Sequence, residues 1–161
     1  MPTCHLLLGS NLGDRAALLS AARQQLVAAV GPILAASALY ETAAWGREDQ
    51  PAYLNQALAL ATELEPPALL AQCQAAEQAA GRERLERWGS RTLDVDILLF
   101  DDLQLDLPAL TVPHPRLAGR RFALLPLAEI ALEVLVPGHG RTVAQLLAVC
   151  PDVLPVRRWS A

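Results

Sequence analysis

The order of strand-length and helix-length segments is the feature that most constrains the fold of this chain. Four short apolar runs have the length of strands: residues 4–9, 33–42, 54–62 and 93–100. Two longer segments have the length of helices: residues 14–30 and 66–80. The first helix can begin at Asp14, whose carboxylate can cap it, and the second can begin at Pro66-Pro67, because proline is tolerated in a first helical turn.

The resulting order is strand, helix, strand, strand, helix, strand. It predicts an α+β fold with a ferredoxin-like split βαβ sandwich, in which helices pack on an antiparallel or mixed sheet. From residue 101 we expect a C-terminal extension of short strands and turns, with helices at 122–130 and 143–149. No repeat or linker interrupts the pattern, so we expect residues 1–161 to form a single domain, long enough to bury a core.

Charge and composition narrow the class of protein. The net charge of -4 does not favour a general nucleic-acid binder, because such domains usually carry a basic face. No apolar run reaches the roughly 18 residues of a membrane span, and the N-terminus lacks the basic start of a signal peptide, so we expect a soluble cytoplasmic protein. Cys4, Cys73 and Cys150 are too widely spaced for a zinc or CxxC pattern, so we expect buried apolar side chains.

The segment Asp94-Val95-Asp96 is the strongest sign of chemistry. Side chains alternate between the faces of a strand, so both carboxylates point the same way. Neighbouring carboxylates repel and raise the pKa of one another, and a hard divalent cation removes that conflict. Mg²⁺ prefers one or two carboxylates together with waters and substrate phosphates. A solvated polar strand face is the alternative interpretation.

Arginines surround this aspartate pair in the sequence. All 13 basic residues are arginine, and no GxxxxGK[ST] or GxGxxG cradle is present. Four arginines precede the aspartates closely and three follow: Arg82, Arg84, Arg87 and Arg91, then Arg116, Arg120 and Arg121. One guanidinium group can bind two phosphate oxygens at once. Arginines that bind phosphate, beside carboxylates that bind Mg²⁺, therefore predict a polyphosphate site. The alternative is a salt-bridged or solvated loop, to which Glu83 and Glu86 would contribute.

A few aromatic and polar residues are candidates for ligand contacts. Tyr53 and Asn55 share a strand face. There the ring could stack on a flat heterocycle and the carboxamide could hydrogen-bond its edge. An equal alternative is that Tyr53 packs at the margin of the core and Asn55 lies in a turn. Trp45 and Trp88 lie in predicted loops, where they can act as lids or as simple anchors. His114, set between two prolines, can donate to a phosphate, but a lone histidine is usually structural or exposed.

Five blocks of this sequence, in order, resemble those of the 6-hydroxymethyl-7,8-dihydropterin pyrophosphokinase family. The blocks are residues 9–15 (GSNLGDR), 40–42 (YET), 50–55 (QPAYLN), 87–100 (RWGSRTLDVDILLF) and 112–116 (VPHPR). The fourth is the most specific and is similar to the family signature R-W-G-P-R-T-[LI]-D-[LIV]-D-[IL]. Ser90 departs from that signature, which commonly has proline there, and Ala109 stands where some members carry arginine.

The resemblance implies a ferredoxin-like fold and a reaction in folate biosynthesis. The enzyme would transfer pyrophosphate from ATP to the hydroxymethyl group of 6-hydroxymethyl-7,8-dihydropterin and release AMP. It would act as a monomer on these two small-molecule partners, with two Mg²⁺ ions held by Asp94 and Asp96 and with ATP as co-substrate.

The resemblance also implies roles for individual residues. The catalytic set would be Arg82, Arg91, Asp94 and Asp96. The pterin would contact Thr42, Trp45, Tyr53, Asn55 and Phe122. ATP would contact Gln74, Glu77, Arg84, Arg87, Trp88, Ile97, Thr111, His114 and Arg120. Two other functions stay open on the residues alone: a ligand-binding module without catalysis, and a different Mg-dependent nucleotidyl or phosphoryl transferase.

Overall fold

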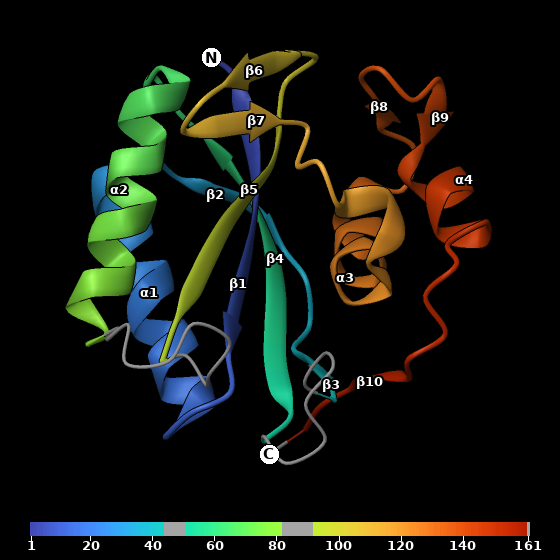
Figure 1. Cartoon of the computed structure of the whole chain (residues 1–161). Coiled ribbons are helices and arrows are strands. Elements are labelled where there is room, and N and C mark those ends of the chain that lie inside the picture. The colour runs from blue at the N-terminus through green and yellow to red at the C-terminus, as the bar shows by residue number, and fades with distance from the viewer. Residues whose placement is uncertain (44–50, 82–91, 161) are drawn as a thin grey trace.

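The computed structural model describes residues 1–43, 51–81 and 92–160. Figure 1 shows a central sheet with helices packed on both of its faces. The predicted loop at 82–91 and most of the one at 43–51 lie outside the described residues. Among the described residues, no helix has both the length and the apolar character needed to cross a membrane.

The sheet is antiparallel throughout its described pairings. Its strands are β1 (Thr3–Ser10), β2 (Ile33–Ala36), β3 (Tyr40–Thr42), β4 (Tyr53–Ala61), β5 (Asp94–Phe100) and β10 (Val156–Arg158). The strand order is β10-β3-β4-β1-β5, and β2 also pairs with β4. The predicted α+β class is therefore confirmed, and the sheet, which was expected to be antiparallel or mixed, is antiparallel.

The sequence run at 33–42 forms two strands, where one was predicted. The break falls at Ser37, whose hydroxyl oxygen accepts from the Ala57 backbone N–H at 2.9 Å. Ser37 also donates its own backbone N–H to the Ala57 carbonyl, at 2.9 Å. Because a side-chain oxygen serves as acceptor at this point, the regular ladder is interrupted between β2 and β3.

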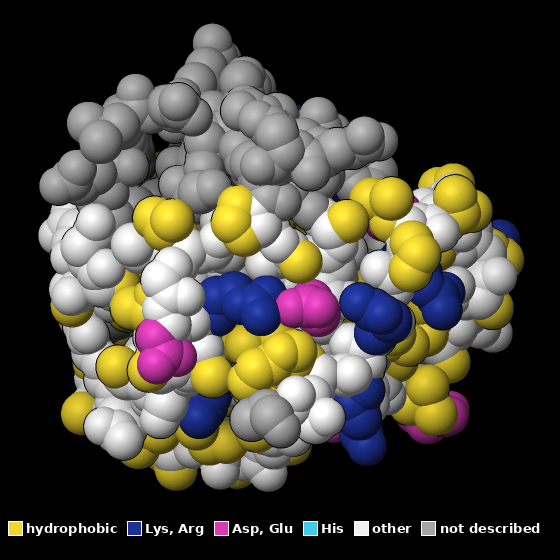
Figure 2. All heavy atoms as spheres, turned by 90° about the horizontal axis from the view of Figure 1, so that it is seen from below, with side chains coloured by type: hydrophobic (Ala, Val, Ile, Leu, Met, Phe, Trp, Pro, Cys, Tyr) yellow, Lys and Arg dark blue, Asp and Glu magenta, His cyan; other side chains and the backbone are white. Residues whose placement is uncertain are grey.

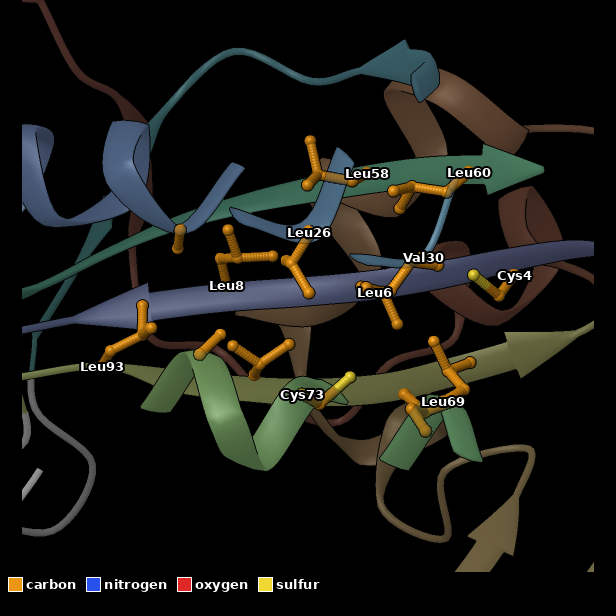
Figure 3. Close-up of a cluster of buried hydrophobic side chains, with 14 of the residues drawn as sticks. Cys4, Leu6, Leu8, Leu26, Val30, Leu58, Leu60, Leu69, Cys73 and Leu93 are labelled. Carbon is orange, nitrogen blue, oxygen red and sulfur yellow. The ribbon is translucent and has the colours of Figure 1, made fainter. Parts of the chain in front are cut away.

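The first face of the sheet is covered by α1 (Arg15–Ala29) and α2 (Pro66–Ala79). Alternate strand residues point toward these helices and form one core cluster. Figure 3 shows its centre, with Cys4, Leu6, Leu8, Leu26, Val30, Leu58, Leu60, Leu69, Cys73 and Leu93. As predicted, the Asp14 carboxylate caps α1, accepting from Ala17 N–H at 3.1 Å, and Pro66 opens α2.

The second face is covered by α3 (Arg121–Ala131), and α4 (Val143–Ala148) packs against α3. Its core includes Leu7, Ala57 and Leu98 from the strands and Leu124 and Leu127 from α3. Since both faces of the sheet are buried, the sequences of β1 and β4 are nearly continuous runs of apolar residues. Of the three cysteines, Cys4 and Cys73 are buried as predicted, but Cys150 is partly exposed. Burial raises the pKa of the Cys4 thiol to about 11.

The C-terminal extension carries short elements between and after the last helices. They are the hairpin β6 (Leu105–Leu107) and β7 (Leu110–Val112), the 3₁₀ turn Leu117–Gly119, and the hairpin β8 (Leu135–Val136) and β9 (Arg141–Thr142). The two predicted helices are confirmed as α3, which continues through Pro126, and α4. The chain then returns to the sheet and adds β10 beside β3, a strand that was not predicted.

Glu129 of α3 joins that helix to the edge of the sheet. Its carboxylate accepts from Tyr40 Oη at 2.6 Å, from the Ala38 backbone N–H at 2.7 Å and from Arg158 Nη2 at 2.8 Å. Burial alone would raise the pKa of Glu129, but these hydrogen bonds outweigh burial and lower it. The ionised carboxylate is therefore the form that stabilises the folded chain.

We expect Glu129→Gln to lower the free energy of unfolding at pH 7 by about 1 kcal/mol, because a neutral amide replaces a partly exposed charged acceptor. The folded pKa is lowered from 4.5, so this stabilisation is present above about pH 4.5 and is lost as the pH falls through the folded pKa. Urea unfolding at pH 7 and pH 3 measures both. Glu133→Gln, an exposed glutamate just beyond α3, is the control. An equal difference between wild type and Glu129→Gln at the two pH values would contradict this account.

Candidate active site

The register of three strands places polar residues in a row at one end of the sheet. Gly9 of β1 lies opposite both Asn55 of β4 and Asp94 of β5, and Asn55 lies opposite Tyr40 of β3. Directly opposed residues of antiparallel strands point to the same face. The row continues the face of Leu7 and Ala57, which is the face that packs against α3.

A second pair lies next to this row. Thr42 of β3 is opposite Tyr53 of β4, and Tyr53 is two residues before Asn55, so all three side chains share the face. Asp96 lies opposite Leu7, two residues along β5 from Asp94. We call Thr42, Tyr53, Asn55, Asp94 and Asp96 the polar end of the sheet. Figure 1 shows it where β1 ends and β4 and β5 begin.

Gly9 makes room for the side chains at this end. A Cβ atom on Gly9 would lie 2.5 Å from Asn55 Oδ1 and 3.9 Å from Tyr53 Cδ1. The first distance is shorter than a contact allows, so Asn55 can lie over β1 only because Gly9 has no side chain. Our sequence reasoning did not single out Gly9, although a glycine inside a strand marks close approach of another group.

Two buried polar atoms at the polar end lack partners among the described residues. Thr42 and Asn55 are each 3% exposed, yet no described residue hydrogen-bonds Thr42 Oγ1 or Asn55 Nδ2. An unsatisfied buried group costs roughly 1–3 kcal/mol. Both groups come from the same face of adjacent strands, so one bound molecule with polar atoms along its edge can satisfy both.

The Asp94 and Asp96 carboxylates are half-buried and lie near Arg120, which is also half-buried. Burial lowers the pKa of Arg120, and the charge of Arg116 adds to this, while Asp96 and Asp94 act in the opposite direction. Arg120 is therefore within electrostatic reach of both carboxylates. No cluster of three or more metal-binding side chains occurs in the part of the chain that the structure describes. Two carboxylates fit Mg²⁺, which takes its other ligands from water and phosphate.

The start of α3 brings a cation and a ring to the site. Arg120 precedes the helix, and its guanidinium carbon is 5.5 Å from the centroid of the Phe122 ring. This is the range of a cation–π contact. Both side chains are half-buried, so each keeps a surface that a ligand can contact.

His114 is uncharged at neutral pH. Burial lowers its pKa to about 4, and the charges of Arg120 and Arg116 add to this effect. Nδ1 of His114 accepts from the Arg116 backbone N–H at 3.1 Å. That hydrogen bond assigns the ring proton to Nε2, so a neutral His114 can still donate one hydrogen bond to an anion.

Ion pairs hold the ends of β3 and β4 beside this site. Arg15 Nη1 contacts Glu41 Oε2 at 2.7 Å and the Ala52 carbonyl oxygen at 2.9 Å, and Arg157 lies 3.6 Å from Glu41. Glu41 precedes Thr42, and Ala52 precedes Tyr53. Figure 2, seen from below, shows basic and acidic side chains alternating in a row across this part of the surface.

The other residues predicted for the ATP site lie in several places. Glu77 is buried on α2 and accepts from the Val95 backbone N–H at 3.0 Å, while Gln74 is exposed on the same helix. Thr111 Oγ1 contacts Asp106 Oδ1 at 3.3 Å. The Ile97 side chain is buried in the core against α1 and α2, so ATP could contact only its backbone. The remaining predicted residues lie outside the described residues: Trp45, Arg82, Arg84, Arg87, Trp88 and Arg91.

A carboxylate pair with a nearby arginine and a neutral histidine, on an α+β fold, is typical of a transferase that handles phosphate groups. Comparison with known proteins identifies the family. The family model for 7,8-dihydro-6-hydroxymethylpterin-pyrophosphokinase (HPPK) matches residues 5–132. The chain belongs to this family.

Two relatives and one solved structure illustrate the similarity. The 2-amino-4-hydroxy-6-hydroxymethyldihydropteridine pyrophosphokinase of Methylorubrum extorquens is 44% identical over 149 residues, which are 92% of this chain and 93% of the relative. The Pseudomonas aeruginosa protein of that name is 43% identical and covers 91% of each chain. The Plasmodium falciparum HPPK-DHPS structure with pteroate has a TM-score of 0.73 at 17% identity. It covers 91% of this chain, which spans only 42% of that one, and it supports the fold alone.

We expect Gly9→Ala to raise the KM for the pterin about tenfold or more, because the new methyl group displaces the Asn55 carboxamide. The KM for ATP should stay near the wild-type value. Gly119→Ala is the matched control, since a Cβ there meets no atom within 4 Å. Steady-state kinetics with each substrate varied in turn measures the effect. An unchanged pterin KM in Gly9→Ala would mean that the Asn55 carboxamide does not hydrogen-bond the pterin.

We expect the imidazole of His114 to titrate with a midpoint of about pH 4 in ligand-free protein. Arg120→Gln should raise the midpoint, because it removes a nearby positive charge. The midpoint should stay below 6.5, because burial is the larger cause. Two-dimensional ¹H–¹⁵N NMR of the imidazole ring measures this. A wild-type midpoint near 6.5 would show that His114 is not buried beside the arginines.

Proposed function

We propose that the polar end of the sheet is the active site at which this chain carries out the reaction of its family. That reaction transfers pyrophosphate from ATP to the hydroxymethyl group of 6-hydroxymethyl-7,8-dihydropterin, with release of AMP, in folate biosynthesis. One observation carries the assignment of the site. Thr42 Oγ1 and Asn55 Nδ2 are buried, with no hydrogen-bond partner in the described part of the chain, on the face that also bears Asp94 and Asp96.

In this proposal the pterin lies flat at the polar end. Thr42 and Asn55 hydrogen-bond its edge, which would satisfy both orphaned groups. Tyr53 stacks on one side of the ring and Phe122 on the other, because the two side chains come from the sheet and from the helix packed on that face. Trp45 would complete the contacts. This arrangement would bring the hydroxymethyl group toward the carboxylate pair.

The residues near Asp94 and Asp96 bind the ATP phosphates in this proposal. Arg120 offers a planar cation, and neutral His114 offers the N–H at Nε2. Arg82 and Arg91 would join them as catalytic residues, and the rest of ATP would contact Gln74, Glu77, Arg84, Arg87, Trp88, Thr111 and the backbone of Ile97. Guanidinium donors suit phosphate oxygens, because each presents two parallel N–H groups.

Asp94 and Asp96 would hold two Mg²⁺ ions together with the phosphates. When bound, Mg²⁺ supplies charge neutralisation to phosphate oxygens and orients the reacting groups. Two half-buried carboxylates on one strand face are a suitable donor set, because the phosphates and water provide the remaining oxygen ligands.

The transfer itself is a displacement at the β-phosphorus of ATP. A bond forms from the pterin hydroxymethyl oxygen to that phosphorus, and the bond to the oxygen that bridges the α-phosphorus breaks, so AMP leaves with that oxygen. The hydroxyl proton is released to solvent. Positioning and charge stabilisation carry most of the catalysis in such transfers. Thr42, Asn55, Tyr53 and Phe122 would orient the acceptor, while Arg120 and His114 would stabilise charge on phosphate.

The finer features of the protein belong to the same proposal. The strand order β5-β1-β4-β3, with a helix after β1 and another after β4, supports the ferredoxin-like arrangement. Core clusters on both faces of one sheet support a single domain over residues 1–161. We propose that this domain acts as a monomer in the cytoplasm, where ATP, its co-substrate, is present.

The proposal is tested by AMP release from ATP and Mg²⁺, with and without 6-hydroxymethyl-7,8-dihydropterin. We expect AMP, without ADP, only when the pterin is present. ADP formation would mean a different phosphoryl transferase. No nucleotide turnover by folded protein would favour a binding module.

We expect Asp96→Ala to lower kcat in this assay by about a thousandfold or more, because loss of a metal ligand removes several kcal/mol of charge stabilisation. Asp102→Ala, an exposed aspartate beyond the far end of β5, should leave the rate unchanged. Near-normal turnover by Asp96→Ala at saturating Mg²⁺ would remove the aspartate pair from the mechanism.

A further inference from the structure

The C-terminal tail, residues 151–159, contacts both sides of the candidate active site, although it lies outside residues 5–132 of the family match. At one end Asp152 holds the start of α3, and at the other end β10 pairs with β3. We propose that this tail is a strap that sets the position of Phe122 and Arg120 relative to Thr42 and Tyr53, with Asp152 as a positioning residue for pterin binding. This inference rests on the function proposed above.

Asp152 acts as the N-terminal cap of α3 from a distant part of the chain. The residue at the N-cap position, Arg120, makes no side-chain cap hydrogen bond. Instead the Arg121 backbone N–H donates to Asp152 Oδ2 at 3.1 Å, and the Leu154 backbone N–H donates to Asp152 Oδ1 at 3.0 Å. Asp152 is 9% exposed, so both oxygens are bound in a largely dry position.

The capped residue stands between the two side chains that face the ligand. Arg121 is the neighbour of Arg120 and of Phe122, which contact each other at 5.5 Å. Fixing the backbone at Arg121 therefore fixes where both side chains begin. A negative charge at a helix N-terminus also interacts favourably with the helix dipole, which adds to the hold of Asp152 on this turn.

The other end of the strap is fixed to the edge of the sheet. Val156 lies opposite Thr42 and Arg158 opposite Tyr40, and the Trp159 backbone N–H donates to the Leu39 carbonyl at 2.8 Å. Figure 1 shows the tail running from α4 past α3 to this edge. The tail thus reaches the strand that carries Thr42, which is itself paired with Tyr53.

The strap is short and stiff enough to set a distance. The four backbone steps from Asp152 to Val156 span at most roughly 14 Å when fully extended. Pro151 and Pro155 precede the two anchors, and proline restricts both its own φ angle and the conformation of the residue before it. While both anchors hold, this short segment therefore limits how far the first turn of α3 can move from β3.

Loss of Asp152 should loosen this turn and leave the helix in place. The rest of α3 is held independently by Leu124 and Leu127 in the core and by the Glu129 carboxylate at β3. Asp152→Ala should therefore fold, with Phe122 and Arg120 less well positioned. Asp152→Asn keeps one acceptor oxygen and no charge, so it should retain one of the two hydrogen bonds.

The test compares these variants with Thr142→Ala in the AMP-release assay, well below each melting temperature. Thr142 caps α4 through its hydroxyl, at 3.2 Å from the Gln145 backbone nitrogen, so this control also loses a helix cap, but away from the site. For Asp152→Ala we expect the pterin KM to rise about tenfold, with kcat within about threefold of wild type. Asp152→Asn should give an intermediate KM, and Thr142→Ala an unchanged one. Hydrogen exchange at residues 121–124 should quicken only in the Asp152 variants.

Each other result counts against the inference. Wild-type kinetic constants in a folded Asp152→Ala would contradict the role of the strap, and so would an equal rise in the pterin KM of Thr142→Ala. Neither result would contradict the proposed function. A fall in kcat alone, without a change in KM or in hydrogen exchange, would also overturn it. A wild type without pterin-dependent AMP release would overturn the proposed function and this inference together.

Discussion

The pairing of β1 with β4 on one side and with β5 on the other is the constraint on which the rest of the site depends. It places Gly9 between Asn55 and Asp94 in one cross-strand row. Any shift by one residue would turn the side chains of one strand to the opposite face and separate the carboxylates from the carboxamide. Apolar residues enforce this register, because Leu6 and Leu8 must face α1 and α2 while Leu7 faces α3.

Burial of both faces explains where polar residues can lie. Helices cover the middle of the sheet on each side, so a carboxylate there would be desolvated without a partner. At the end of the strands the apolar cover gives way to Thr42, Tyr53, Asn55, Asp94 and Asp96. Thr42 and Asn55 are nearly inaccessible, and each has one side-chain atom without a hydrogen-bond partner among the described residues, which is expected of a site that a ligand completes.

Electrostatics at this end depend on tertiary contacts. Arg120 and Arg116 lie near His114, and together with burial they keep its ring uncharged at neutral pH. The histidine can then donate a hydrogen bond without adding a charge, while Arg120 places a positive charge near the two aspartates. Glu129 joins α3 to β3, and Asp152 joins the start of α3 to the C-terminal tail, so the helix that carries Phe122 is held near both of its ends.

The sequence by itself determined the order of strands and helices, the cap of α1, the proline start of α2, and the fact that Asp94 and Asp96 share a face. These depend on local periodicity and on residues close along the chain. The blocks around Asp94, Tyr53 and His114 also determined the family. Only the tertiary structure decided the break at Ser37, the added strand β10, the close approach over Gly9, the neutral charge of His114 and the cap that Asp152 supplies. Each of these depends on tertiary packing, and for most of them on groups that are distant in sequence, and local pattern carries no information about which distant groups meet.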